Sequence, residues 1–195
     1  MKSIVFNTEM VRAILDGRKT QVREIIKPQP SNQNYALWRI ASSTNKKIVD
    51  KYYWADVNQS EIWLRDDVYF KPKYQADEII YVREAFQIIP PNMVFYKADT
   101  ENKEKTGWKP SIYMPEKIAR IFLKVTNVRV QQLQDITEEE AIAEGSNILT
   151  SSLALINPII GFQDIWAEKY GVNSWDKNPY VWVYAIEIVE TKQEY

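Results

Sequence analysis

The chain contains no cysteine and no histidine. Without cysteine it can form no disulfide, no thiolate nucleophile and no cysteine-ligated zinc site. Without histidine it lacks the general base of Ser-His-Asp triads and the ligand of nearly every zinc or non-haem iron site. Any catalysis must therefore use Lys, Asp, Glu, Tyr, Ser or Thr, and we expect neither a metal nor another cofactor.

Long apolar runs and a strong net charge are also missing. No run approaches the ~20 apolar residues that cross a membrane, and the first apolar stretch is too short for a signal peptide. The net charge of −1 excludes the overall basic field of strong nucleic-acid binders, so any such contact depends on a local patch. We expect a soluble cytoplasmic protein, and 195 residues suit one domain or one domain with a sizeable insertion.

A cationic segment spans residues 16–23. Gly17 is suited to end a helix, because glycine tolerates positive φ. Arg18, Lys19 and Arg23 follow it, and an extended backbone from Lys19 onward places Lys19 and Arg23 on the same strand face. Such a pair can anchor a phosphate. Taken alone, the cluster is also explained by a charged turn that leads into a solvated strand face.

The pattern of apolar residues indicates many strands and three short helices. We expect strands at 3–7, 19–26, 77–84, 95–98, 117–133 with a kink at 126–127, and 180–190, and helices at 8–16, 135–145 and 157–170. Between them, a hairpin of 35–40 with 47–54 and a second pair of 61–65 with 68–70 are expected. Without a βαβ rhythm, this pattern predicts an α+β fold, a small mixed β-barrel with flanking helices.

The helix at 135–145 carries clear end signals. Thr137 and Glu140 form a capping box, and Gly145 ends the helix. Glu144 departs from the pattern, because a helix dipole disfavours a carboxylate at the C-terminal end. A residue that breaks a local rule is a candidate for function, although one surface glutamate costs little.

Several motifs occur in an order that resembles the ASCH domain of the PUA-like superfamily, most closely the ASCH proteins of phages and prophages. They lie at residues 13–21, 108–115, 133–139, 143–145 and 175–183. The resemblance covers nearly the whole chain except about 31–75. It implies a single ASCH/PUA-like domain over 1–195, with an insertion of short strands at about 31–75. It also implies a PUA-like mixed β-barrel, a cleft beside the Gly-Arg-Lys-Thr turn, and the cytoplasm of a bacterial host.

The superfamily is associated with RNA or modified nucleosides, so the resemblance favours a protein that binds RNA or a modified nucleotide in this cleft. A phosphate would be held by cations, a base would stack on an aromatic ring, and a polar side chain would read the base edge. The binding residues expected on this basis are Arg18, Lys19, Arg23, Arg83, Glu84, Trp108, Ser111, Tyr113 and Asn178.

An alternative is an amidohydrolase that acts on an acylated nucleoside such as acetylcytidine. One ASCH branch uses a Lys, a Thr and a Glu, and its Lys and Glu match Lys19 and Glu144. Its Thr falls on Val22 or Gln21 here. Thr20 matches a different family threonine, but it is the first candidate to replace the missing one, so the catalytic residues of an enzyme would be Lys19, Glu144 and Thr20. A lysine beside other cations can have a pKa low enough for it to act as a base.

A third hypothesis is a phage accessory protein without enzymatic activity. The near-neutral charge argues against tight, sequence-independent binding to long nucleic acid. Both site hypotheses require Lys19, Arg23, Glu84 and Glu144 to converge on one concavity.

Overall fold

The computed structural model describes residues 1–31, 34–58, 69–100, 106–146 and 157–191. The chain forms two compact units: Met1–Glu24 with Tyr74–Tyr195, and Ile25–Lys73. The predicted strand at 61–65 lies outside the described residues. The prediction of one domain with an insertion at about 31–75 stays a prediction, since compactness alone does not identify an insertion.

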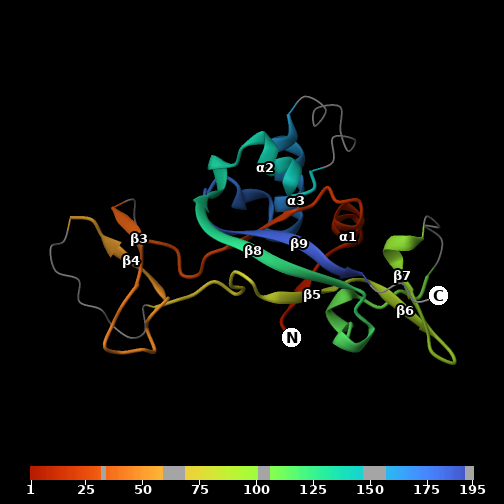
Figure 1. Ribbon diagram of the computed structural model, residues 1–195. Helices are drawn as coiled ribbons and strands as arrows, with labels where there is room; N and C mark the ends of the chain where they lie inside the picture. Colours follow the sequence, from red (N-terminus) through yellow and green to blue (C-terminus); the bar gives the residue numbers. More distant parts are fainter. Residues whose placement is uncertain (32–33, 59–68, 101–105, 147–156, 192–195) are drawn as a thin grey trace. The chain divides into compact units, whose positions relative to one another are not determined.

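The larger unit is built on a mixed five-stranded sheet. Its strands are β1 (Ser3–Val5), β2 (Gln21–Ile25), β5 (Ile79–Arg83), β8 (Ile121–Gln132) and β9 (Tyr180–Thr191), in the order β1-β5-β8-β9-β2. β1 runs parallel to β5, whereas β5–β8 and β8–β9 are antiparallel. The long β8–β9 pair passes through the centre of this unit (Figure 1). These strands confirm the predicted ones; β1, β2, β5 and β8 are shorter than predicted, and β9 extends one residue further.

The sheet is open, which corrects the closed barrel expected from the resemblance. A barrel requires every strand to be paired on both sides. Here β1 and β2 form the two edges of the described sheet, and β1 is only three residues long. The fold is therefore α+β with a mixed open sheet and few helices.

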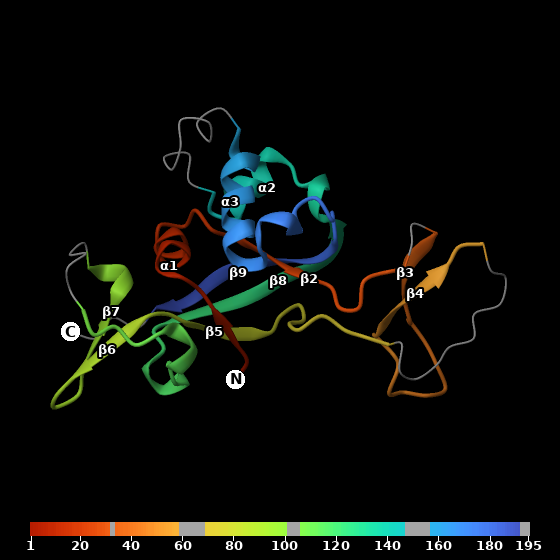
Figure 2. The same cartoon turned by 180° about the vertical axis from the view of Figure 1, so that it is seen from behind.

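Three short helices lie on one side of the β8–β9 pair (Figures 1 and 2). They are α1 (Thr8–Leu15), α2 (Glu138–Ala143) and α3 (Pro158–Tyr170). Thr137 and Glu140 make the predicted capping box of α2, and the Asn157 side chain caps α3 by accepting from Ile159 N. No helix in the described part of the chain is long and apolar enough to span a membrane.

β8 bends where the sequence predicted a kink. The β8–β9 register shifts between Val125 and Asn127, as expected for a β-bulge at this step. On β9, consecutive residues from Val181 to Tyr184 are all buried. Both faces of β9 are therefore covered over this stretch.

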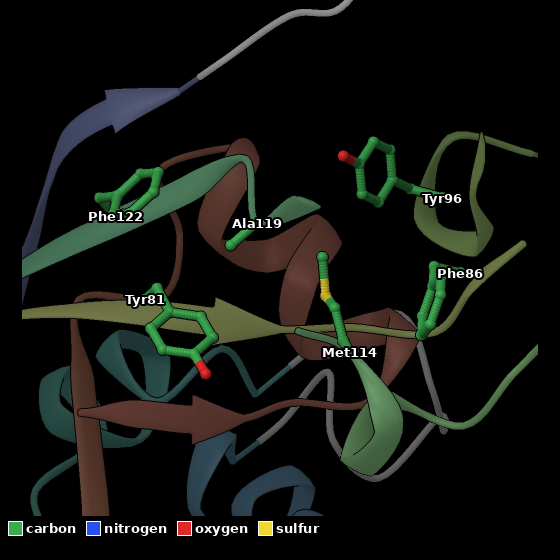
Figure 3. Packing of buried hydrophobic residues seen from close by; sticks show 6 residues of the cluster. All are labelled: Tyr81, Phe86, Tyr96, Met114, Ala119 and Phe122. Atoms are coloured by element: carbon green, nitrogen blue, oxygen red, sulfur yellow. The ribbon is translucent and has the colours of Figure 1, made fainter. Parts of the chain in front are cut away.

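A separate apolar cluster holds the 108–115 segment. The hairpin of β6 (Phe86–Ile89) and β7 (Met93–Tyr96) supplies Phe86 and Tyr96, and the sheet supplies Tyr81 and Phe122. Met114 lies between Tyr81 and Phe86 in the view of Figure 3 and is 1% exposed. Segment 108–115 therefore packs against β5, β6 and β7.

The smaller unit contains the first expected hairpin. β3 (Tyr35–Arg39) pairs antiparallel with β4 (Tyr52–Asp56), and Phe70 adds an isolated bridge to Tyr52. Trp54 is buried and donates to Pro28 O at 2.9 Å. The pairing confirms the prediction, although β4 starts later than expected because turns occupy residues 46–50.

Two glycines with positive φ allow a matched test of this turn region. Gly17 has φ +72° with nothing within 4 Å of a built Cβ, whereas Gly145 has φ +84° and its Cβ would lie 3.1 Å from Ala13 Cβ and 3.3 Å from Lys19 Cβ. Both alanine variants pay about 1–2 kcal/mol for the left-handed backbone. We expect Gly145→Ala to lower the free energy of unfolding, measured in urea, by more than Gly17→Ala. Equal losses of the free energy of unfolding in the two variants would show that Ala13 and Lys19 can move away from the new Cβ at residue 145 without an energetic cost.

Candidate functional site

The turn after α1 delivers Lys19 to the end of α2. Gly17 reverses the chain, and the backbone N–H groups of Arg18 and Lys19 both donate to Ala13 O. Lys19 then forms an isolated antiparallel bridge with Glu144. The turn and the α2 C-terminus, 125 residues apart in sequence, are therefore joined through their backbones as well as their side chains.

Lys19, Arg23 and Glu144 form a buried charged cluster. Lys19 Nζ donates to Glu144 Oε2 at 3.0 Å and to Glu144 O at 2.7 Å. Arg23 Nη1 donates to the other carboxylate oxygen, Glu144 Oε1, at 2.9 Å. The three residues are only 3–4% exposed. Two cations therefore compensate the carboxylate that a helix C-terminus disfavours.

A second carboxylate completes the charge balance. Arg23 Nη2 donates to Glu140 Oε2 at 2.7 Å and to Gln131 Oε1 at 3.0 Å, and Arg129 also pairs with Glu140. Burial raises the pKa of Glu140, but hydrogen bonds from Gln131 and Thr137 and the charges of the two arginines outweigh it and lower the pKa overall. Glu140 thus stays ionised and neutralises Arg23.

Burial also changes the pKa of Lys19. Removal from water lowers the pKa of its ammonium group, and Glu144 opposes this shift by its charge and its hydrogen bond. Lys169 and Arg23 add smaller repulsions, and the net pKa lies below the usual 10.5. Lys19 therefore releases its proton more readily than an ordinary lysine does.

Two adjoining pockets flank this cluster. The smaller, of about 30 Å³, is lined by Lys19, Arg23 and Glu144 together with apolar side chains that include Phe6, Phe162 and Trp166. The larger, of about 260 Å³, lies between α1 and α3 and is lined by Asn7, Glu9, Met10, Arg18, Gly145, Gly161, Asp164, Ile165 and Glu168. Met10 and Ile165 line both pockets. In the described part of the chain, no group of three or more Asp and Glu side chains is arranged to hold a metal ion.

Arg18 and Thr20 lie outside the buried cluster. Arg18 pairs with Asp16 at 2.8 Å and lines the larger pocket. Thr20 is exposed and lines neither pocket. Its backbone N–H donates to Ala143 O at 2.7 Å. Thr20 therefore helps to join the turn to α2 through its backbone.

Glu84 and Arg83 make other contacts. Glu84 is 1% exposed and accepts from Arg120 Nε at 2.9 Å and Nη2 at 3.0 Å. Burial raises the pKa of Glu84 in spite of Arg120. Arg83 Nε donates to Met114 O at 3.1 Å. Neither residue lines the two pockets beside Lys19, so the expected convergence holds for Lys19, Arg23 and Glu144 but not for Glu84.

The predicted stacking and edge-reading residues are also elsewhere. Trp108 and Tyr113 line an open groove of about 670 Å³ with Lys109 and Lys117, and it shares no lining residue with the Lys19 pockets. Ser111 begins the short turn beside this groove. Asn178 Oδ1 accepts from Gln134 N at 2.8 Å. In the described part of the chain, these residues therefore do not line the pockets beside Lys19.

Sequence reasoning missed two participants. Glu140 was interpreted only as a helix cap, yet it also pairs with Arg23 and Arg129. Trp166 lies within the predicted helix at 157–170 and was not among the predicted site residues, yet it lines the smaller pocket. A helical pattern gives no signal for either role, since a cap and a core aromatic are the ordinary reasons for such residues.

Comparison with known proteins does not assign a family. No family model matches the chain, and no curated protein matches it. A crystal structure of protein EF3133 from Enterococcus faecalis V583, of family DUF984, is similar at a TM-score of 0.41 with 9% identity. The match covers 100% of this chain and 85% of that chain. A TM-score this low carries no argument, so the ASCH assignment stays a prediction.

Removing Glu144 tests how strongly the cluster supports the fold. Glu144→Gln leaves Lys19 and Arg23 without their shared buried partner, and we expect it to lower the free energy of unfolding by about 3–5 kcal/mol. The control is Glu78→Gln, which breaks the exposed pair with Lys2 and should cost less than about 1 kcal/mol. Urea denaturation measures both, and similar losses would contradict the structural role of the cluster.

The lowered pKa of Lys19 gives a pH prediction. A ¹³C NMR titration of the lysine side chains should place the Lys19 midpoint below 10.5, and that of Lys124, whose pKa is raised mainly by its hydrogen bond to Asp77, above it. Between the folded-state pKa and 10.5 the unfolded chain binds more protons at this lysine. Lys19 therefore makes the free energy of unfolding rise with pH across that window and fall as pH drops through it. A Lys19 midpoint at or above that of Lys124 would contradict the burial effect.

Proposed function

We propose that the chain binds a modified nucleoside or nucleotide, free or as part of an RNA, as an ASCH-type protein of the PUA-like superfamily. The observation that carries this proposal is the pocket of about 260 Å³ beside the turn at residues 17–20, lined by Arg18 and Gly145 and adjoining the buried Lys19–Glu144 pair. Its volume lies just below the range of about 300–1,000 Å³ typical of small-molecule sites. Such a space suits one nucleoside better than an extended chain.

The charges around this pocket favour the nucleoside over its phosphate. Glu9, Asp164 and Glu168 line it, against the single cation Arg18, which already pairs with Asp16. Carboxylates accept hydrogen bonds from amino groups such as those of cytosine and adenine, but they repel phosphate. A ligand without phosphates, or with a phosphate directed outward, therefore suits this lining.

Reversing one of these charges tests the ligand class. In calorimetric titrations with cytidine, N4-acetylcytidine and cytidine monophosphate, we expect Asp164→Lys to weaken binding of the nucleosides by about tenfold, since a hydrogen bond to a charged group contributes on the order of 1.5–3 kcal/mol. The same variant should weaken binding of cytidine monophosphate less than binding of the nucleosides, because the new lysine attracts the phosphate. Asp176→Lys makes the same charge change outside the pocket and serves as the control.

A short single-stranded RNA belongs in the same titrations. Nucleoside binding that responds to Asp164→Lys but not to Asp176→Lys supports the proposal. Binding of the RNA alone would instead favour contacts outside this pocket, where the groove with Trp108 and Lys109 offers an aromatic and basic surface. No binding of any probe would reject the proposal and favour the accessory-protein hypothesis. Phage or prophage origin stays a prediction from the motifs.

Amide hydrolysis is a second candidate, favoured by the contact between Lys19 Nζ and Glu144 Oε2 at 3.0 Å and by the lowered pKa of the lysine. In this reaction the oxygen of a water molecule bonds to the acyl carbon and the C–N bond breaks. The amine leaves with a proton that originates from the water, and acetate and cytidine are the products from N4-acetylcytidine. A neutral Lys19 would accept the proton from water, and Glu144 would orient the lysine.

Direct attack by water suits this site better than attack by Thr20. Thr20 is exposed, whereas Lys19 is only 4% exposed. The family threonine expected three residues after the lysine is Val22 here, which is 3% exposed and apolar. The hydrolytic hypothesis therefore rests on Lys19 and Glu144 without an adjacent threonine nucleophile.

Turnover of N4-acetylcytidine is the direct test of this candidate. Chromatography should detect cytidine release by the wild-type protein and its loss in Lys19→Met, because methionine keeps much of the volume but not the amine. Thr20→Val should retain the activity, which separates the water mechanism from a threonine nucleophile. Circular dichroism of each variant checks that the fold is intact, and turnover that survives Lys19→Met would reject the mechanism.

A further inference from the structure

The smaller pocket contains a hydrogen-bonding feature that neither candidate function uses. Among the described residues, four buried side-chain polar atoms have no hydrogen-bond partner: Arg23 Nε, Gln87 Oε1, Ser146 Oγ and Trp166 Nε1. Two of these, Arg23 Nε and Trp166 Nε1, are N–H donors, and both residues line the pocket of about 30 Å³ beside Lys19. A buried donor without an acceptor is rare in folded proteins and requires an explanation.

The remaining donors of Arg23 are fully used. Its Nη1 donates to Glu144 and more weakly to Gln21, at 2.9 and 3.4 Å, and its Nη2 donates to Glu140 and Gln131, at 2.7 and 3.0 Å. A guanidinium group carries five N–H donors, so only Nε–H is left. These bonds from separate elements hold the guanidinium in place, and Nε–H cannot rotate toward another acceptor.

Trp166 is held next to the same region by aromatic packing. Its ring lies 4.3 Å from that of Tyr170 and 6.0 Å from that of Phe162, measured between centroids. The Arg23 guanidinium lies 5.7 Å from the Phe162 centroid. Phe162 therefore lies beside both donor residues. Trp166 itself is buried, with 2% of its surface exposed. The two N–H groups belong to one rigid, water-poor region.

The size and charge of the pocket restrict what can accept from these donors. A volume of about 30 Å³ holds little more than one oxygen-sized group, which excludes a whole phosphate. Lys19, Arg23 and Lys169 line it against the carboxylate of Glu144, so an electron-rich oxygen is favoured there. The larger pocket shares Met10 and Ile165 with it, so the two pockets adjoin.

We propose that Arg23 Nε–H and Trp166 Nε1–H form a two-donor site for a carbonyl oxygen of the ligand. This inference rests on the proposed function and specifies it: the ligand is an acylated base, or a base with a ring carbonyl, that points its oxygen between the two donors. Trp166 thereby acts as a binding residue that selects ligands carrying such an oxygen, because the unpaired N–H groups penalise ligands that lack one.

A small probe tests the donor site apart from nucleoside binding. In ¹H–¹⁵N NMR spectra, the indole N–H resonance of Trp166, assigned through Trp166→Phe, should move downfield and saturate on titration with acetamide. The indole resonance of Trp175 is the control, since Trp175 packs on Phe162 at 6.3 Å but does not line the pocket. Acetate, titrated in parallel, distinguishes a neutral carbonyl from an anion.

Each outcome of this titration decides the proposal. A saturable shift of Trp166 alone with acetamide supports it. A response to acetate but not to acetamide overturns it in favour of an anion site. No response to either probe leaves a buried water as the only acceptor and also overturns it. These results do not depend on whether cytidine or N4-acetylcytidine binds, so failure of the donor site and failure of the proposed function are distinguishable.

Paired variants extend the test to the nucleoside. Trp166→Phe removes the N–H but keeps an aromatic ring, and we expect it to weaken binding of N4-acetylcytidine by about tenfold. Trp175→Phe makes the same chemical change outside the pocket and should leave binding unchanged. Equal effects of the two variants, or none for Trp166→Phe in a protein that binds the nucleoside, would remove the role of Trp166 in binding.

Discussion

The buried pairing of Glu144 with Lys19 and Arg23 is the interaction on which the larger unit depends. It connects the turn after α1 and the edge strand β2 to the end of α2, with Lys19 and Arg23 lying 125 and 121 residues before Glu144 in the sequence. Burying two cations and a carboxylate is costly unless each is paired, and removing one partner leaves the others uncompensated. The same pairing therefore stabilises the fold and holds the cluster beside the pockets.

The charged side chains of this cluster are paired, and one of them, Lys19, also has a lowered pKa. Glu144 and Glu140 neutralise Arg23, which fixes the arginine as a structural group with one remaining donor. Lys19 is paired as well, but its burial lowers its pKa more than Glu144 raises it. The cluster thus holds an arginine in place and lowers the pKa of a buried lysine. It is poorly suited to capture of a phosphate, because the cations are already bonded and sit in a small space.

The open sheet and the docking of segment 108–115 separate surfaces that the resemblance had placed in one cleft. The Lys19 pockets lie at α1 and α3, whereas the groove with Trp108 and Tyr113 is formed by β6 and the turns that follow it. Met114 and Phe86 fix that segment through apolar packing. Base stacking in the groove and chemistry at Lys19 would therefore involve different ligands or different parts of a large one.

By itself, the sequence determined most of the elements and some of the pairing, although the strand β6 was not predicted. Alternating apolar residues placed the strands, the capping box placed α2, and the unusual position of Glu144 identified it as a candidate beside Lys19 and Arg23. Only the tertiary structure decided that Glu84 pairs with Arg120 instead, that Glu140 neutralises Arg23, and that Trp166 lines a pocket. Local sequence patterns indicate whether a segment forms a helix or a strand and which of its faces is apolar. The partner of a buried charge instead depends on which distant segments the fold brings together.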